Sequence, residues 1–343
     1  MDNPDVRFDS HTREGVDDGW ANDDELPVLR TQVTEEVPRT VITQNRSPDL
    51  SFDRSINPYR GCEHGCIYCY ARPSHAYLGL SPGLDFETRL IARPDAPEVL
   101  QRELRAKRYV PRTIAIGTNT DPYQPIERDR KIMRGLLQVL SDFNHPVAII
   151  TKGALITRDI DILGPMAAKG LVRVGISVTT LDPATSRAME PRVPLPAVRL
   201  RAIRALSDAG IDVRVMVSPV VPALTDHELE AILQTAAQAG AVAASSIVLR
   251  LPREVSGLFR DWLQEAYPDR AARIMGRVRE LHGGLDYDPA FGTRMSGQGE
   301  WARLLRQRFV LATRRLGLDR TLVPLRTDLF AVPTQPGDQL SLL

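Results

Sequence analysis

The stretch that decides the fold is NPYRGCEHGCIYCYAR, residues 57–72. It holds all three cysteines of the chain, Cys62, Cys66 and Cys69, in the spacing CxxxCxxC. Because the set is odd in number and tightly clustered, it cannot build a disulfide framework and indicates an inorganic ligand. Three thiolates at these offsets can wrap one loop around a cubic [4Fe–4S] cluster and leave the fourth iron without a protein cysteine. An open iron is typical of a reactive cluster rather than an electron carrier.

A zinc site is the alternative for the same residues. Zinc takes four ligands in structural sites, and His64 or His75 could supply the fourth. Zinc knuckles more often show paired CxxC motifs, and His64 also fits an ordinary loop residue. The sequence therefore favours the cluster over zinc.

Short apolar runs alternate with helix-like segments on the C-terminal side of the cysteines. The expected strands are residues 113–117, 147–151, 172–178, 213–218 and 246–251, and the expected helices lie near 96–108, 128–142, 157–168, 197–209 and 225–239. Continuous apolar strands separated by helices predict a parallel sheet with right-handed crossovers. A short strand before Cys62 brings the count to six units, so we predict an α/β fold, a partial (β/α)6 TIM-type barrel.

The chain divides into four predicted parts. Residues 1–45 are an acidic flexible arm with eleven acids against four arginines, and with a short extended piece near Val41 and Ile42. Residues 46–251 form the barrel core, and residues 252–330 form a helical C-terminal extension. Residues 331–343 form a flexible tail that begins with the Pro/Gly-rich sequence AVPTQPGD.

Composition narrows the function classes only slightly. The net charge is +1, so no global field favours nucleic acid or membranes. Residues 250–326 hold fifteen arginines and no lysine, which is weak support for an anionic partner because arginine outnumbers lysine throughout. No signal peptide or membrane-spanning stretch is recognisable, so we expect a cytoplasmic protein with no membrane partner.

The cysteine motif resembles the signature of the radical S-adenosylmethionine (SAM) superfamily. Residues 57–251 are similar to its branch of spore photoproduct lyase-like, or DNA repair photolyase-like, proteins. The similarity includes GTNTDPYQPIE at 117–127, RDID at 158–161, SVTTLD at 177–182 and EPR at 190–192. The resemblance implies a [4Fe–4S] cluster and SAM as cofactors, and an electron donor that the sequence does not identify. It also implies reductive cleavage of SAM to a 5′-deoxyadenosyl radical, which abstracts hydrogen from a substrate, with damaged DNA expected.

The resemblance and the strand ends together suggest the binding residues. The cluster ligands are the three cysteines, and the expected SAM-binding residues are Tyr68, Gly117, Thr118, Asn119, Thr120, Asp121, Ser177, Thr179, Glu190 and Arg199. Residues 117–121 and the Ser177/Thr179 pair follow strands, where catalytic groups of such barrels gather. Residues 117–121 could instead be a plain turn, and alternating Ser and Thr are common in strands. Glu190 and Arg199 resemble the pair that meets the ribose and the carboxylate of SAM.

One departure from the branch concerns the final hydrogen donor. Some spore photoproduct lyases use a further cysteine, and this chain has none outside the cluster motif. Tyr123 is our catalytic candidate for the donor, with Tyr70 and Tyr77 as alternatives by residue type. Other readings stay open, namely radical SAM chemistry on RNA, protein or a metabolite, and a non-catalytic iron–sulfur or zinc protein.

The last five residues, Gln339–Leu343 (QLSLL), resemble the pentapeptide with which bacterial replication and repair proteins bind the sliding clamp. A tail behind a tether can present leucines to an apolar groove. Chance leucines at a chain end are the alternative. Clamp binding would agree with a role in DNA repair.

Overall fold

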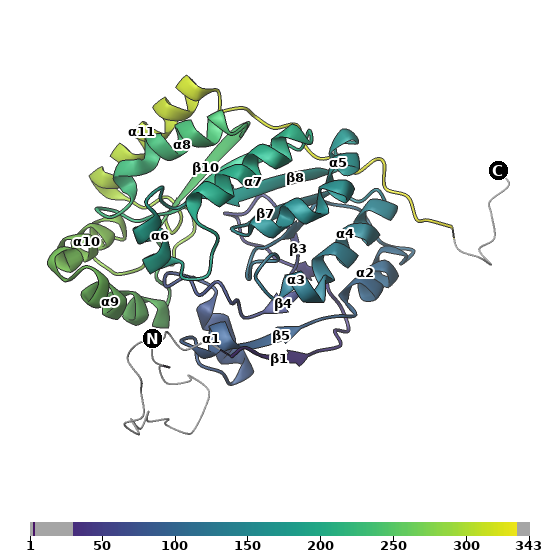
Figure 1. Cartoon of the computed structure of the whole chain (residues 1–343), viewed down its shortest axis with the longest axis horizontal. Helices are drawn as coiled ribbons and strands as arrows, with labels where there is room; N and C mark the ends of the chain where they lie inside the picture. The colour runs from purple at the N-terminus through teal and green to yellow at the C-terminus, as the bar shows by residue number, and fades with distance from the viewer. Residues whose placement is uncertain (1–2, 4–29, 335–343) are drawn as a thin grey trace.

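The computed structural model describes residue 3 and residues 30–334, and its largest element is a seven-stranded sheet in the order β10-β9-β8-β7-β6-β3-β2 (Figure 1). Every neighbouring pair from β3 to β10 is parallel, whereas β2 joins the edge antiparallel to β3. The six parallel strands confirm the predicted partial (β/α)6 barrel. The strands are β2 Thr43–Gln44, β3 Arg54–Ile56, β6 Ile114–Ile116, β7 Val147–Thr151, β8 Val172–Ser177, β9 Val213–Val220 and β10 Ala243–Val248.

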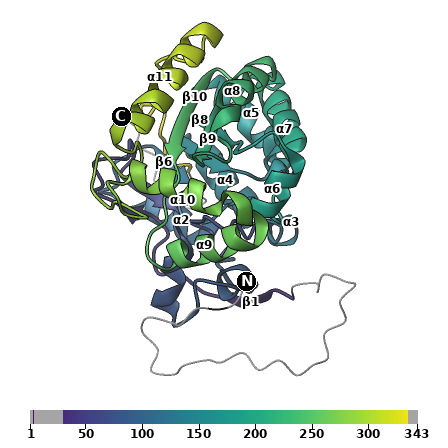
Figure 2. The ribbon, with the colours of Figure 1, turned by 90° about the vertical axis from the view of Figure 1, so that its left-hand side faces the viewer.

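Helices pack on the outer face of this curved sheet (Figure 2). In β8, Val172, Val174 and Ile176 point outward into the main core, while the residues between them face the barrel interior. This period-2 alternation is why one face buries apolar side chains and the other stays free for a site. The helices are α2 Ala96–Leu104, α3 Glu127–Arg130, α4 Ile132–Asp142, α5 Ile160–Ala168, α6 Pro183–Met189, α7 Pro196–Asp208 and α8 Leu229–Gln238, with short 3₁₀ turns η2 Ala154–Asp159 and η3 Asp226–Glu228.

The last strand differs from its prediction by three residues. The sequence predicted residues 246–251, but β10 is Ala243–Val248. Leu249 and Leu251 are buried in a second apolar cluster with helices α9 and α10 rather than in the sheet. An apolar run continues across both environments, so hydrophobicity alone could not locate the strand end.

A small second sheet joins the N-terminal segment to the cysteine region. It has the order β1-β5-β4, formed by Gln32–Glu35, Arg89–Ala92 and Tyr59–Arg60. The prediction of a flexible arm is wrong for this segment, because β1 pairs in parallel with β5 and Glu36 lies 3.3–3.4 Å from Arg60 and Arg93. Strand β2 lies next to the expected extended piece at Val41 and Ile42. Residues 1–2 and 4–29 of the arm lie outside the described residues.

Two short helical segments, η1 Arg72–Leu78 and α1 Asp85–Thr88, lie between β4 and β5.

The C-terminal part is helical, as predicted. After β10 come α9 Glu254–Ala266, α10 Pro268–Leu281 and α11 Gly299–Leu316. Helix α11 packs along the free edge at β10 and α8. None of the helices in the described part has the length and apolar character needed to span a bilayer.

Residues 319–334, which we call the C-terminal strap, cross the N-terminal ends of the barrel strands. The strap begins beside β10, where Ala243 pairs with Asp319, and the Val323 carbonyl accepts a hydrogen bond from Arg173. In Figure 1 it is the yellow segment that leaves α11 and passes α5. It therefore covers the end of the barrel opposite the strand ends that carry the candidate site.

Candidate active site

One cavity of about 990 Å³ occupies the barrel interior, and the three cysteines line it. Its wall combines the cysteine loop, the inner faces of the strands, the loop of residues 45–52 and helix α11. The polar and aromatic lining includes His64, Tyr68, Tyr70, residues 117–121, Lys152 and Ser177. Most of the predicted cofactor-binding residues therefore share one space with the cysteines.

The cysteine loop is fixed by buried polar groups that the sequence did not single out. Gly61 has φ +78°, and a Cβ there would lie 2.6 Å from the Leu90 side chain, so only glycine fits. The fully buried Arg72 guanidinium donates to the carbonyls of Gly65, Cys66, Pro82 and Gly83. The buried Gln124 accepts from the Glu63 amide at 2.8 Å and donates to the Gly61 carbonyl. These bonds satisfy the backbone of an irregular buried loop and hold its shape.

The thiols of Cys62 and Cys66 are poor acids without a cation. Burial, and then the charge of Asp121, raise the pKa of Cys62 well above its usual value, and burial raises the pKa of Cys66 to about 12. A bound metal centre would supply the positive charge that such thiols need to act as thiolates. Within residues 3 and 30–334, no three His, Cys, Asp or Glu side chains surround a single-ion position.

The histidines of the zinc alternative have other contacts. The His75 Nε2 atom lies 2.9 Å from the Arg89 carbonyl oxygen, and its ring packs edge-on against Phe86. His64 lines the cavity, and its Nδ1 lies 3.5 Å from the carboxylate of Asp121. Neither ring is placed with the cysteines as a fourth ligand of one ion.

Residues 117–121 follow β6 and line the cavity, as expected for a binding segment. Gly117 has φ +89°, and a Cβ there would lie 1.9 Å from the Ile150 carbonyl oxygen, so the close approach to β7 requires glycine. The Thr120 hydroxyl donates to the Tyr59 carbonyl, and the Asn119 amide donates to the Asn57 side chain. The segment is therefore a fixed rim rather than a free turn.

Asp121 anchors this rim to the end of β7. Its carboxylate accepts hydrogen bonds from the Lys152 amide at 2.7 Å, the Tyr123 amide at 2.9 Å and the Thr151 hydroxyl at 2.5 Å. Burial alone would raise the pKa of Asp121, but His64 and these bonds lower it to about 2. Asp121 is therefore an anion that organises the loop, and its acceptor atoms are largely used by the protein itself.

The predicted pair Glu190 and Arg199 faces inward, away from the cavity. Both side chains are completely buried, they form an ion pair with each other, and neither lines the cavity. Arg199 also donates to the Pro194 and Ser177 carbonyls. The structure thus differs from the expectation that this pair contacts SAM, because its donors and acceptors are already used.

Tyr68 and Thr179 connect that ion pair to the cavity wall. Both hydroxyls donate to the Glu190 carboxylate, the Thr179 bond being 2.9 Å. The Tyr68 ring lines the cavity, whereas Thr179 does not. Ser177, at the end of β8, lines the cavity and remains the member of the Ser177/Thr179 pair that a ligand can reach.

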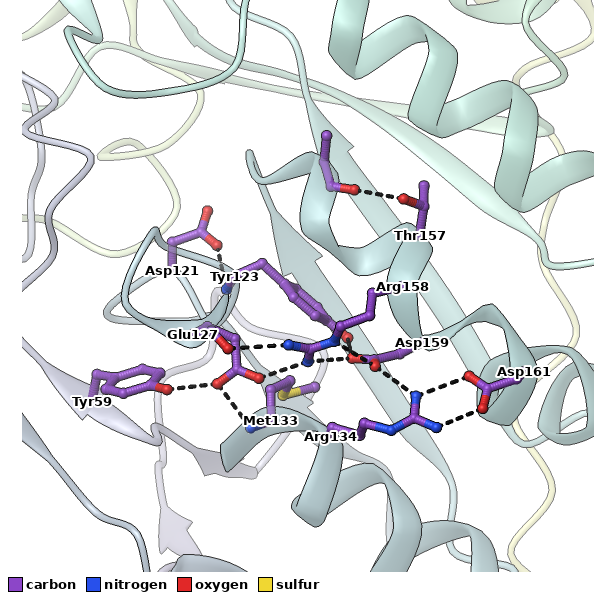
Figure 3. A network of polar contacts seen from close by, with 11 residues as sticks. Tyr59, Asp121, Tyr123, Glu127, Met133, Arg134, Thr157, Arg158, Asp159 and Asp161 are labelled. Atoms are coloured by element: carbon purple, nitrogen blue, oxygen red, sulfur yellow. Dashed lines mark hydrogen bonds and ion pairs between the residues drawn. The ribbon is translucent and has the colours of Figure 1, made fainter. Parts of the chain in front are cut away.

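A second buried network lies behind residues 117–127 (Figure 3). Arg158 binds the fully buried carboxylates of Glu127 and Asp159 at 2.7 and 2.8 Å, and Arg134 links Asp159 to Asp161. The RDID motif of the sequence is thus part of a structural ion network that joins α3, η2, α4 and α5.

The structure contradicts Tyr123 as the hydrogen donor. Its hydroxyl donates to Asp159 at 3.1 Å within this network, and its buried ring does not line the cavity. Tyr77 is largely exposed and does not line the cavity either. Tyr70 does line it, and its hydroxyl donates to the Thr118 carbonyl while the Arg250 guanidinium lies 5.0 Å from its ring centre. Of the three tyrosines considered, all within the described residues, only Tyr70 reaches the cavity.

Lys152 is a cavity residue that sequence reasoning missed. Its ammonium lies 5.7 Å from the centre of the Tyr68 ring. Burial would lower the pKa of Lys152, but its electrostatic interactions with Cys66 and with the carboxylates of Glu190 and Asp121 raise it, so the side chain is a cation. Its position directly after a predicted strand, at 147–151, is the signal that could have identified it.

Comparison with known proteins agrees with this geometry. The model of the family described as the radical SAM superfamily matches residues 56–236. The chain belongs to the radical SAM superfamily. Uncharacterised proteins of Mycobacterium tuberculosis and Mycobacterium bovis are 37% identical over 290 residues, which are 83% of this chain and 82% of theirs. This radical SAM protein is therefore an enzyme of a superfamily that works with SAM and an iron–sulfur cluster.

Solved structures of spore photoproduct lyase show the same fold. The lyase complexed with dinucleoside spore photoproduct has a TM-score of 0.59 and 16% identity, covering 83% of this chain and 79% of that chain. A mutant of the lyase with bound AdoMet and dinucleoside spore photoproduct gives the same TM-score. The predicted branch of the superfamily is therefore supported at the level of fold.

Proposed function

We propose that Cys62, Cys66 and Cys69 hold a [4Fe–4S] cluster with one open iron, and that the enzyme acts on a lesion in DNA. The bound cluster and SAM together would supply a 5′-deoxyadenosyl radical that abstracts a hydrogen atom. The observation that carries the proposal is one cavity in the barrel interior, lined by all three cysteines and by several cationic side chains. Chemistry inside a barrel limits the access of water to a reactive carbon radical.

Residues around the cysteine loop are suited to holding SAM. The Lys152 ammonium can pair with the carboxylate of SAM, and Ser177 can reach a hydroxyl or carboxylate group. Thr118 and Asn119 offer polar groups on the rim beside the cysteines. Asp121 fixes the rim through its hydrogen bonds, and the Glu190–Arg199 pair fixes the end of β8 from one layer behind the cavity wall.

Arginines favour an anionic substrate. Arg250 lines the cavity from the segment after β10, and Arg306 lines it from α11. Arg294, in the loop between α10 and α11, also lines it and pairs with Asp49 at 2.6 Å, and Tyr70 and Phe309 add aromatic rings. Guanidinium groups with aromatic neighbours suit a nucleotide, because one binds phosphate and the other stacks on a base. The fold of spore photoproduct lyase supports the same substrate class. A lesion must leave the base stack to enter such a cavity.

Tyr70 is the side chain that we assign to the final hydrogen transfer. The chain has no cysteine besides the three of the cluster motif. A product radical in the cavity would take a hydrogen atom from the Tyr70 hydroxyl and leave a tyrosyl radical. That tyrosyl radical must recover a hydrogen atom from 5′-deoxyadenosine, so that SAM is regenerated, or an electron and a proton from the external electron donor.

Anaerobic reconstitution tests the proposal in two stages. Enzyme reduced with dithionite should convert SAM to 5′-deoxyadenosine, and a protein with serine in place of Cys66 should not. Ultraviolet-damaged DNA should then give repaired product and isotope exchange into nucleobases. SAM cleavage without any change in damaged DNA would refute the DNA substrate and favour RNA, protein or a metabolite. No cleavage of SAM would refute the enzymatic proposal as a whole.

We also propose that Gln339–Leu343 binds the bacterial sliding clamp. The pentapeptide sequence supports this, and its residues lie outside the described part. The strap ends where Arg105 donates to the Pro333 carbonyl at 2.8 Å, on the covered end of the barrel. Pull-down with the full chain and with a chain ending at residue 338 tests it, and equal recovery would refute it.

A further inference from the structure

The floor of the barrel carries two arginines that nothing in the proposed radical chemistry uses. Arg173 and Arg214 come from the neighbouring strands β8 and β9, and both line the cavity at its N-terminal end. Arg214 lies opposite Gly175 in the register, which puts it one step higher in the barrel than Arg173. Two guanidinium groups therefore share the bottom of the space that holds the cysteines at its top.

Neither arginine has a carboxylate partner within 4 Å in the described part of the chain. Arg173 donates to the Val323 carbonyl of the strap at 2.6 Å, and Arg214 has no hydrogen bond or ion pair among described residues. The Nε atoms of both are buried without a hydrogen-bond partner. Burial, followed by the neighbouring charge of Arg214, lowers the pKa of Arg173, whereas the Asp212 carboxylate acts in the opposite direction. Two like charges with buried, unused donors are costly unless an anion satisfies them.

Small residues leave room for that anion. The strand register places Ser55, Ala115, Ala148 and Arg173 at one level of the interior, and all four line the cavity. Arg173 is thus the large side chain on a level otherwise lined by alanines and a serine. The space beside its guanidinium is part of the cavity rather than of the packed core.

We infer that Arg173 and Arg214 form an oxyanion site that binds a phosphate ester group of a ligand held in the barrel. The planar guanidinium of an arginine can donate paired hydrogen bonds to two phosphate oxygens. Two arginines on adjacent strands can therefore hold one phosphate from two sides. Ser177 lies four residues after Arg173 along β8, at a distance of about 13 Å. A ligand anchored by its phosphate at the floor would extend toward the cysteine loop. The inference rests on the proposed function only in assuming that substrate enters this cavity.

Binding of simple probes tests the site without turnover. Calorimetry on the reconstituted full chain would use inorganic phosphate, thymidine 5′-monophosphate and uncharged thymidine. We expect the monophosphate to bind more tightly than either phosphate or thymidine. Arg173→Met and Arg214→Met should each weaken its binding about tenfold to a hundredfold. The control Arg260→Met changes a half-exposed arginine of α9 that does not line the cavity and should leave binding unchanged.

Two further measurements separate anion binding from a purely structural role of these arginines. Neither Arg→Met variant should lower Tm by much, because both side chains are only partly buried and neither has a carboxylate within 4 Å in the described part of the chain. Arg214→Lys should bind with intermediate affinity. Phosphate should not displace SAM, because the two sites lie at opposite ends of the cavity. Equal binding of the monophosphate by the wild type and the double variant would overturn the inference, as would no binding by the wild type. Equal affinity for phosphate and monophosphate would overturn the assignment of an ester. Loss of SAM cleavage with intact phosphate binding would count against the proposed function alone.

Discussion

Replacing Glu190 with glutamine tests whether the buried ion pair is the structural support of the site. Glu190→Gln keeps the shape of the side chain but leaves the Arg199 guanidinium charged in a completely buried position. Removing one partner of a buried pair costs about 3–5 kcal/mol. At an unfolding entropy of about 2 cal/mol/K per residue, that cost lowers the Tm of a chain of 343 residues by roughly 4–7 °C.

Thermal unfolding followed by circular dichroism measures this loss. The matched control is Glu300→Gln, which breaks the exposed pair of Glu300 with Arg303 on α11 and should shift Tm by less than about 1 °C. Adding Arg199→Met to Glu190→Gln should cost much less than Arg199→Met in the wild type, because the two residues share one interaction. If Glu190→Gln shifts Tm no more than Glu300→Gln does, the pair is not the support that its burial indicates.

Three other changes examine two residues of the cavity and one buried histidine. Lys152→Met should weaken SAM binding by about tenfold or more, because it removes a charged contact. The iron content after reconstitution should stay unchanged. Unchanged SAM affinity in equilibrium dialysis would contradict that role. Tyr70→Phe should keep the formation of 5′-deoxyadenosine but yield less repaired product per SAM cleaved, and an unchanged ratio would remove Tyr70 as the donor. Burial lowers the pKa of His145 to about 4, so the unfolded chain binds more protons between pH 6.5 and 4 and stability falls across this range. From pH 7.5 to 5 the loss assigned to this ring is about 2 kcal/mol, and His145→Gln should reduce the acid dependence of urea unfolding by that amount.

The barrel was predictable because its signals are local and repeated. Runs such as Val147–Thr151 and Val172–Ser177 are short, apolar and β-branched, and each ends in a polar residue at the site. The cysteine spacing is equally local, since eight consecutive positions define it. These features are fixed by the pleat and by ligand chemistry, which a single sequence displays directly.

The roles of single polar residues were less predictable, because they depend on whether the side chain reaches the cavity or lies one layer behind its wall. Tyr123, Glu190 and Arg199 have the residue types of a site, yet each is buried one layer behind the cavity. The sequence did not indicate the roles of Arg72 and Lys152. Arg72 holds the cysteine loop, and Lys152 faces the cavity. A sequence gives the side of a strand on which a residue lies, but not what the neighbouring elements place in front of it.

For the arginines of α11, the number of charges matters less than whether a carboxylate already pairs with each guanidinium. The fifteen arginines in residues 250–326 include Arg303, Arg306 and Arg308 of α11. Arg303 pairs with Glu300, and Arg308 binds Glu230 at 2.6 Å and so joins α11 to α8. Among the described residues, Arg306 has no ion pair and lines the cavity.

Neutralising these three arginines one at a time separates binding from structural roles. Arg306→Gln should reduce affinity for a single-stranded oligonucleotide and flatten its salt dependence by about one ion, because one phosphate contact is lost. Arg303→Gln should leave both quantities unchanged, since its charge is already met by Glu300 on the surface. Arg308→Gln should instead lower Tm without changing the salt slope, because it loosens α11 from α8. Equal losses of affinity from all three changes would mean that charge density, and not the cavity, attracts the nucleic acid.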